Sequence, residues 1–202
     1  MVFVRLLAIS YILLLIACAS PPQNTGNICN LFDDKRNWFR AARQAEERWG
    51  VPIPVSMAFI QQESGFAGRA RPARKKILGF IPGPRPSSAF GFAQAQDSTW
   101  DDYRKMSGNG IARRSNFADA VDFVAWYNHN SYRINNIAKD DAYNLYLAYH
   151  EGNTGFKRGS YQGKAWLIDV ARKVQVNTIV YDLQFQQCER ELGKNWVERL
   201  FS

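Results

Sequence analysis

The sequence predicts a single all-α domain, and three observations support this fold class. The chain has 202 residues, of which 46% are hydrophobic and 14% aromatic, enough for one well-filled core and too few for two ordinary domains. Its apolar residues recur at the spacing of helices. No segment shows the sustained alternation of apolar and polar residues that is typical of a half-buried strand. We therefore expect one compact, all-helical domain.

The first predicted helix covers residues 31–49. Its apolar face consists of Leu31, Phe32, Trp38, Phe39, Ala42, Ala45 and Trp49, and Gly50 follows as a stop signal. Pro52 and Pro54 then interrupt the chain before a shorter apolar helix, which we expect over residues 55–63. The last residue of this second helix is Glu63.

Four more helices are expected downstream. One begins with Asp97 as its N-cap, and Ser115 caps the next. A third begins at Asp141 and stops before Gly152, and a long amphipathic helix covers residues 164–191. Together with the first two, these helices fill most of the chain.

One segment, between Glu63 and Asp97, does not follow the helical pattern. It contains no acidic residue, but it holds Arg69, Arg71, Arg74, Lys75, Lys76 and Arg85 together with Pro72, Pro82, Pro84 and Pro86. We expect a long, basic, irregular loop beside the helix that ends at Glu63. Two interpretations stay open: a solvated charge run whose Ile77, Leu78, Phe80 and Ile81 fold back on the core, or one wall of a groove for an anionic polymer.

Charge and motifs exclude several classes of function. The formal net charge of +8 indicates an anionic partner if the partner is a polymer. No G-x-S-x-G elbow is present, and the turn at residues 107–110 lacks the strand and the Lys of a phosphate-binding loop. With only His129 and His150 as imidazole ligands, we expect neither a metal site nor a cofactor.

The N-terminus has the composition of an export signal. Arg5 precedes an apolar run over residues 6–16, which is too short to cross a bilayer as a lasting helix. The run ends at Ala17 and Cys18, which resembles the bacterial lipoprotein signal. The resemblance implies that residues 1–17 are removed and that Cys18 carries the lipid. The alternative is a cysteine within an ordinary signal peptide that is cleaved elsewhere.

The polar, Pro-rich residues 18–28 are then expected to form a tether, and residues 29–202 the folded domain. The tether follows a lipid attached at Cys18, and Ala19 rather than Asp follows that cysteine, as in lipoproteins sorted to the outer membrane. The expected location is the periplasmic face of the cell envelope. Cys29 and Cys188 would meet an oxidising environment there, so we expect a disulfide between them.

Glu63 is the best-placed candidate for acid and base chemistry. It ends an apolar helix and is flanked by Phe59, Ile60 and Phe66, which predicts partial desolvation and a raised pKa. A single Glu at the end of a helix is usually an exposed structural residue. The motifs around it are therefore needed to support a catalytic role.

Three motifs resemble those of the lytic transglycosylase family, whose catalytic domain has the goose-type lysozyme-like helical fold. The first is Glu63-Ser64 followed by Phe66, which is similar to the family's E-S motif. The second, Ser-Ala-Phe-Gly-Phe-Ala-Gln at residues 88–94, resembles G-A-x-G-L-M-Q, and the third, Ala-Tyr-His-Glu-Gly at residues 148–152, resembles A-Y-N-A-G. The resemblance covers roughly residues 52–174.

The resemblance implies a function and a role for each matching residue. The substrate is peptidoglycan, cleaved between N-acetylmuramic acid and N-acetylglucosamine, with formation of 1,6-anhydromuramyl ends. Glu63 is the general acid, Gln94 binds the glycan near the scissile bond, and Ser64 lies in the cleft. Tyr149 orients Glu63 or the substrate. The C6 hydroxyl group of the substrate attacks the anomeric carbon, so one carboxyl group is sufficient.

The sequence departs from the family pattern at three places, one of which is the basic loop, which is longer than the corresponding family segment. Ala93 stands where the family has Met, and Phe92 is expected to restore the apolar contact with the sugar. His150 and Glu151 replace Asn and Ala, which makes Glu151 a further substrate-binding candidate. The aromatic residues Trp100, Tyr103, Trp126 and Tyr127 offer stacking surfaces for sugars, although most are expected in the core.

Two alternative functions stay open. A lysozyme-type hydrolase would need Asp97, Asp101, Asp102 or Glu151 to position a water molecule. A non-catalytic, peptidoglycan-binding lipoprotein would use the same groove to dock an envelope complex, for which the sequence names no partner. Nucleic acid is excluded as a partner by export.

Overall fold

The structure is a computed structural model that describes residue 22 and residues 24–194. The elements are α2 (Ile28–Asp34), α3 (Arg36–Trp49), α4 (Ile53–Ser64), β1 (Lys76–Ile77), β2 (Ile81–Pro82), α5 (Asp97–Ser107), α6 (Phe117–Asn135), α7 (Ala142–Lys157) and α8 (Ala165–Gly193). The all-α prediction is confirmed, because β1 and β2 are only a two-residue antiparallel pair. The expected signal peptide, residues 1–17, and Cys18 lie outside the described residues.

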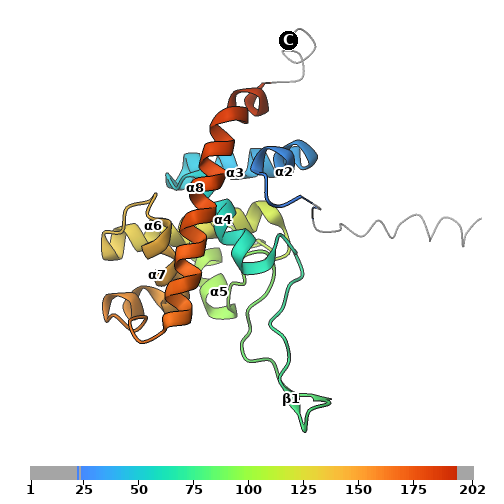
Figure 1. Ribbon diagram of the computed structural model, residues 1–202, viewed down its shortest axis with the longest axis vertical. Coiled ribbons are helices and arrows are strands. Elements are labelled where there is room, and N and C mark those ends of the chain that lie inside the picture. Colours follow the sequence, from blue (N-terminus) through green and yellow to red (C-terminus); the bar gives the residue numbers. More distant parts are fainter. Residues whose placement is uncertain (1–21, 23, 195–202) are drawn as a thin grey trace, which may run out of the picture.

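Helix α8 runs along the body of the molecule, and α2, α4 and α7 pack against it (Figure 1). Helix α4 also contacts α3 and α6, which places it in the centre. Pro52 precedes α4, and Gly65 ends it in the left-handed conformation, with φ 56°. Every residue from Ile53 to Ile60 is buried. Helix α4 therefore leaves the core only in its last turn, which carries Glu63.

The first predicted helix is two helices. Lys35 has φ −122° and ψ 66°, which ends α2 before α3 begins. The expected tether at residues 18–28 is also too long at its C-terminal end. The carbonyl oxygen of Thr25 accepts a hydrogen bond from Tyr181, and the amide of Ile28 donates to Gln184 at 3.0 Å. These bonds attach the start of the domain to α8 before residue 29.

The structure caps one helix at its predicted start and differs from the prediction at the two predicted caps. Asp141 caps α7, with its carboxylate accepting from the amide of Asn144 at 3.0 Å. The cap predicted at Ser115 is wrong, because the side chain of Asn116 accepts the capping bond from α6. Asp97 is the first residue of α5 rather than its N-cap, and its carboxylate pairs with Arg114 at 2.7 Å.

The disulfide between Cys29 and Cys188 is confirmed. It links α2 to the last part of α8 across a sequence separation of 159 residues. A crosslink that closes so long a loop restricts the unfolded chain strongly.

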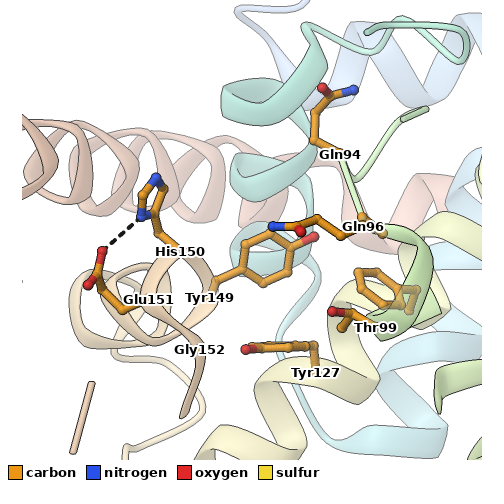
Figure 2. Close-up of a pocket in the computed structure, with 10 residues that line it drawn as sticks. Gln94, Gln96, Thr99, Tyr127, Tyr149, His150, Glu151 and Gly152 are labelled. Carbon is orange, nitrogen blue, oxygen red and sulfur yellow. Dashed lines mark hydrogen bonds and ion pairs between the residues drawn. The ribbon is translucent and has the colours of Figure 1, made fainter. Parts of the chain in front are cut away.

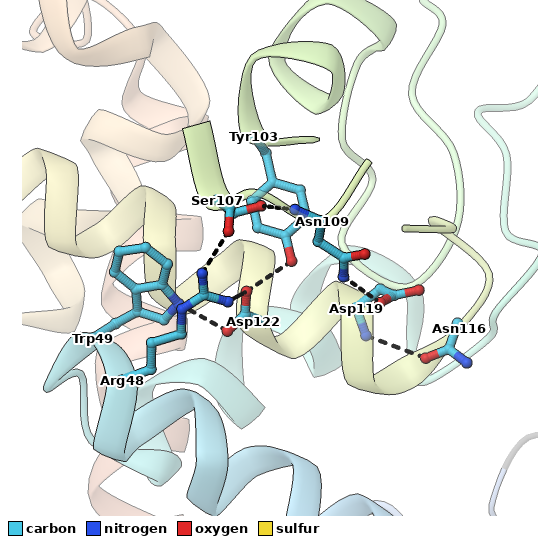
Figure 3. Close-up of polar contacts among 8 residues, drawn as sticks. All are labelled: Arg48, Trp49, Tyr103, Ser107, Asn109, Asn116, Asp119 and Asp122. Atoms are coloured by element: carbon cyan, nitrogen blue, oxygen red, sulfur yellow. Dashed lines mark hydrogen bonds and ion pairs between the residues drawn. The ribbon is translucent and has the colours of Figure 1, made fainter. Parts of the chain in front are cut away.

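A polar cluster around Asp122 joins three helices (Figure 3). The carboxylate of Asp122 on α6 accepts from the indole of Trp49 at 2.8 Å and from the hydroxyl of Tyr103 at 2.7 Å. Arg48 pairs with the same carboxylate and also donates to the carbonyl oxygen of Ser107 at 2.6 Å. The cluster therefore fixes the end of α5 against α3 and α6.

The basic segment forms an arm that projects from the helical body and ends in the β1–β2 hairpin (Figure 1). Of the two interpretations left open, folding back on the core is wrong for Leu78, Phe80 and Ile81, which are exposed. Leu78 is 78% exposed and Phe80 is 74% exposed. Among the described residues, no helix combines the length and apolar character needed to cross a bilayer.

Candidate active site

Glu63 lies half-buried in the last turn of α4, directly after the fully buried part of that helix. Burial raises the pKa of its carboxyl group from 4.5 to about 7, because the charged form loses its hydration. A hydrogen bond from the side chain of Tyr146 acts in the opposite direction and lowers the pKa. Glu63 therefore exchanges a proton near neutral pH, as a general acid requires.

Tyr146 on α7 is a hydrogen-bond partner of this carboxyl group. Its ring packs edge-on against Phe59 of α4, with the centroids 5.3 Å apart. Burial, followed by the charge and the hydrogen bond of Glu63, raises the pKa of Tyr146. The hydroxyl group therefore keeps its proton and serves as a donor to Glu63.

Tyr149 lies one helical turn further along α7 and has a different partner. Its hydroxyl group donates to the carbonyl oxygen of Ala93 at 2.6 Å, and its ring stands perpendicular to Phe59. Burial and then the charge of Glu63 raise the pKa of Tyr149, which shows that the two groups interact. The hydrogen bond to Glu63 comes from Tyr146. The hydroxyl group of Tyr149 instead holds Ala93, in the segment that leads into Gln94.

Gln94 is held by the protein itself. Its amide nitrogen Nε2 donates to the carbonyl oxygens of Ala70 at 3.0 Å and Gly91 at 2.8 Å. Its backbone has φ 46°, in the left-handed region. Figure 2 shows the amide pointing away from the Tyr149 ring. Because Nε2 is engaged on both protons, a contact with a glycan would fall to Oε1.

Gly91 is required by close packing at the base of this segment. It has φ 80°, and a Cβ atom built there would lie 2.1 Å from the carbonyl oxygen of Arg114. Its amide also donates to the carbonyl oxygen of Ala70 at 3.0 Å. Only glycine fits both the conformation and the space.

Phe92 and Ser64 do not reach the pocket. Phe92, which we expected at the sugar, is only 7% exposed and packs edge-on against Trp38 and Phe117, each at 5.5 Å. The ring packs into the core because Phe92 directly follows the tight turn at Gly91. The hydroxyl group of Ser64 donates back to the carbonyl oxygen of Ile60 at 3.2 Å within α4.

A pocket of about 250 Å³ opens between α5, α6 and α7 (Figure 2). Its lining consists of Gln94, Ala95, Gln96, Thr99, Phe123, Tyr127, Tyr149, His150, Glu151 and Gly152. The pocket brings together three residues predicted from sequence, namely Gln94, Tyr149 and Glu151. Glu63 is not part of this lining, but its charge acts on Tyr149, which is.

Two polar lining residues, Gln96 and Thr99, were not predicted from the sequence, although they flank the helix start predicted at Asp97. The apolar lining residues Ala95 and Phe123 were not predicted either. Of the aromatic residues considered for stacking, Tyr127 lines the pocket. The other three, Trp100, Tyr103 and Trp126, are buried in the core.

Glu151 is the acidic residue of the pocket lining, and it is already paired. Lys164 contacts its two carboxylate oxygens at 2.7 and 2.9 Å, Ser160 donates to one of them, and His150 lies 3.1 Å from the other. These contacts, led by Lys164 and Ser160, lower the pKa of Glu151 to about 2. The side chain is only 5% exposed. Glu151 is therefore a charged structural anchor and a very weak base.

The three other carboxylates considered for a hydrolase lie on α5, outside the pocket lining. Asp97 pairs with Arg114, Asp101 pairs with Arg104 at 3.5 Å, and Asp102 is exposed. Within residues 24–194, no three His, Cys, Asp or Glu side chains gather in a way that could hold a metal ion.

Comparison with known proteins agrees with this geometry. The family model described as the transglycosylase SLT domain matches residues 6–188. No curated protein and no solved structure gives a significant match. The match covers most of the chain, including Glu63, the Gln94 segment and the tyrosines of α7. The chain belongs to the transglycosylase SLT family, whose members are enzymes that act on peptidoglycan.

Proposed function

We propose that the protein is a lytic transglycosylase that cleaves the bond between N-acetylmuramic acid and N-acetylglucosamine and leaves 1,6-anhydromuramyl ends. The observation that carries this proposal is the state of Glu63. Its carboxyl group is half-buried, has a pKa of about 7 and receives a hydrogen bond from Tyr146. At neutral pH it is present in both forms, so it can give a proton and take one back.

The proposed reaction uses this carboxyl group twice. Glu63 first donates its proton to the glycosidic oxygen while the bond from the anomeric carbon to that oxygen breaks. The N-acetylglucosamine unit leaves with a free C4 hydroxyl group, and an oxocarbenium-like centre forms on the muramyl ring. The Glu63 carboxylate then accepts the proton of the C6 hydroxyl group as its oxygen bonds to the anomeric carbon. The enzyme is regenerated and no water is consumed.

The condition of Glu151 favours this route over hydrolysis. A hydrolase needs a second carboxylate to act as a base on water or as a nucleophile. The carboxylate of Glu151 is bound by Lys164 and Ser160, and its pKa of about 2 makes it a poor base. One active carboxyl group matches a reaction in which the substrate supplies its own nucleophile.

The remaining residues of the site are proposed to position the substrate. Tyr149 holds the carbonyl oxygen of Ala93, and this contact sets the strained backbone at Gln94. Gln94 and Tyr127 then offer an amide oxygen and an aromatic ring to the glycan. Ser64 contributes to the end of α4 rather than to the pocket lining.

We further propose that the enzyme works as a lipoprotein on the periplasmic face of the envelope, at the outer membrane. The support is the sequence before the domain, namely Arg5, the apolar residues 6–16 and Cys18. In this proposal, residues 1–17 are removed and the catalytic domain begins near residue 25. Membrane attachment that survives Cys18→Ser in fractionated cells would contradict it.

Glu63→Gln tests the catalytic proposal directly. The amide keeps the shape of the side chain but cannot deliver a proton, so clearing of purified sacculi should slow by several orders of magnitude. Glu47→Gln is the matched control, because Glu47 is an exposed Glu on α3. If both variants clear sacculi at a similar rate, Glu63 is not the general acid. Absence of clearing by the wild type would favour a non-catalytic, peptidoglycan-binding role.

A further inference from the structure

The basic arm, residues 69–86, projects from the helical body, and its tip lies away from the helices (Figure 1). Its two legs are hydrogen-bonded to each other. The amide of Gly83 donates to the carbonyl oxygen of Lys75 at 2.7 Å, and Arg85 donates to that of Pro72. At the base, the Arg71 guanidinium lies 4.3 Å from the centroid of the Phe90 ring. These contacts stiffen the arm and hold its tip in solvent.

The tip exposes large apolar side chains. Leu78 is 78% exposed, Phe80 is 74% exposed and Ile81 is 44% exposed. Leu78 also has φ 53°, a left-handed conformation that costs free energy for any residue with a Cβ atom. At 78% exposure, Leu78 buries little apolar surface within the domain to offset this cost. Such a combination is typical of a residue that is kept for contact with another surface.

The charge of the arm has one sign. Its basic residues are Arg69, Arg71, Arg74, Lys75, Lys76 and Arg85, and the arm contains no acidic residue. Within the described part of the chain, none of these six side chains forms an ion pair. The arm also contributes no residue to the lining of the pocket beside Tyr149. Its charge is therefore free to meet an external anion.

We propose that the tip of the basic arm inserts into the surface of an anionic lipid bilayer. Leu78 and Phe80 would enter the boundary between headgroups and acyl chains, and the neighbouring Lys75 and Lys76 would lie at the phosphate groups. The tip is small, convex and apolar, and basic side chains surround it. A fluid bilayer can receive such a surface without a preformed binding pocket. A glycan strand provides anions but no apolar layer to receive two such side chains.

This contact would have a consequence for the enzyme. The carbonyl oxygen of Ala70, at the base of the arm, accepts hydrogen bonds from both Gly91 and Gln94. The arm is thus attached directly to the segment that lines the pocket. A contact of the arm with the bilayer would add to the lipid attachment proposed at Cys18 and set the distance of the site from the membrane.

A fluorophore placed at the tip tests this inference. The full-length chain with Cys18→Ser and Phe80→Cys carries one free thiol, because Cys29 and Cys188 are bonded to each other. The thiol is labelled with the polarity-sensitive probe NBD, and the protein is mixed with phosphatidylcholine vesicles with or without 30% phosphatidylglycerol. Ile111→Cys, at a site that is 89% exposed and outside the arm, is the matched control.

On the anionic vesicles, the fluorescence emission of the label at position 80 should shift to shorter wavelength, and spin-labelled lipids should quench it. The emission of the label at position 111 should remain that of a probe in water. Adding Lys75→Glu and Lys76→Glu should weaken this partition by roughly tenfold or more, and high salt should act in the same direction. An unshifted label at position 80 would overturn the proposal. A shift with sacculi or with envelope proteins, but not with vesicles, would assign the tip to those partners instead. The readout does not depend on glycan cleavage, so it stands apart from the proposed enzymatic function.

Discussion

The hydroxyl group of Tyr146 donates a hydrogen bond to the carboxyl group of Glu63, and this bond opposes only part of the rise in pKa that burial causes. The contact joins α7 to the last turn of α4. Because the bond stabilises the charged form and burial destabilises it, the balance places the pKa near 7 rather than far above it. Tyr146 is therefore a positioning residue that also adjusts the acidity of Glu63.

Tyr146→Phe should shift the alkaline limb of the profile of kcat/KM against pH to higher pH. Protonation of the glycosidic oxygen needs the acid form of Glu63, so the wild-type kcat/KM should fall above about pH 7. Loss of the hydroxyl group removes support for the carboxylate, so the limb should move upward by about one pH unit. Tyr143→Phe, on the same helix, should leave the limb in place. An unchanged limb in Tyr146→Phe, measured with soluble glycan fragments, would limit Tyr146 to packing.

Glu63→Gln should stabilise the fold while it abolishes activity. The pKa of Glu63 is about 7 in the folded chain and 4.5 in a free side chain, so the folded state binds more protons between these values. The free energy of unfolding of the wild type should therefore fall as the pH rises from about 4.5 to 7. The free energy of unfolding of Glu63→Gln does not depend on this titration. The variant should therefore be as stable as the wild type at pH 4 and more stable by at most about 3 kcal/mol at pH 8. Denaturant unfolding at both pH values measures it, and equal stability at pH 8 would mean that Glu63 is well hydrated.

Gly91→Ala should destabilise the domain by about 2–4 kcal/mol. The new Cβ atom would meet the carbonyl oxygen of Arg114 in addition to the strain of a φ of 80°. Gly108→Ala is the control, because Gly108 has φ 75° but nothing within 4 Å of the added atom. Thermal unfolding should show a much larger loss for Gly91→Ala. Similar losses for both variants would mean that the loop at Gly91 moves aside easily.

The disulfide should contribute about 2–5 kcal/mol to stability, because it closes a loop of nearly the whole domain. A chain with Cys29→Ser and Cys188→Ser should unfold at a correspondingly lower denaturant concentration. A reducing agent should lower the stability of the wild type and leave that of the variant unchanged. A reducing agent without effect on the purified wild type would show that the crosslink adds little.

Much of the helical architecture follows from local sequence patterns. The apolar period, Gly50 and the proline pair before α4 predict helices close to those observed, because each signal acts within a few residues. The break at Lys35 has no comparable signal. The hairpin of the basic arm was missed because its strands have only two residues each and therefore show no period.

The site residues that belong to sequence motifs could be predicted, whereas the contacts that depend on the packing of helices could not. Desolvation of Glu63 follows from its apolar neighbours along α4. Tyr143, Tyr146 and Tyr149 share one spacing, so only the packing of α7 against α4 decides which hydroxyl group reaches Glu63. The contacts of Glu151 depend on Ser160 and Lys164, which approach only because the chain turns back after the kink at Gly152.

The masses of the products released from sacculi test the central claim most directly, namely that one carboxyl group carries out the cleavage. Wild-type protein should release muropeptides whose muramyl ends lack the elements of water and resist reduction by borohydride. Glu151→Gln should release the same products, although the loss of its charge opposite Lys164 should lower the melting temperature at neutral pH. Reducible, hydrated muramyl ends from the wild type, lost in Glu151→Gln, would contradict the account and establish a two-carboxylate hydrolase.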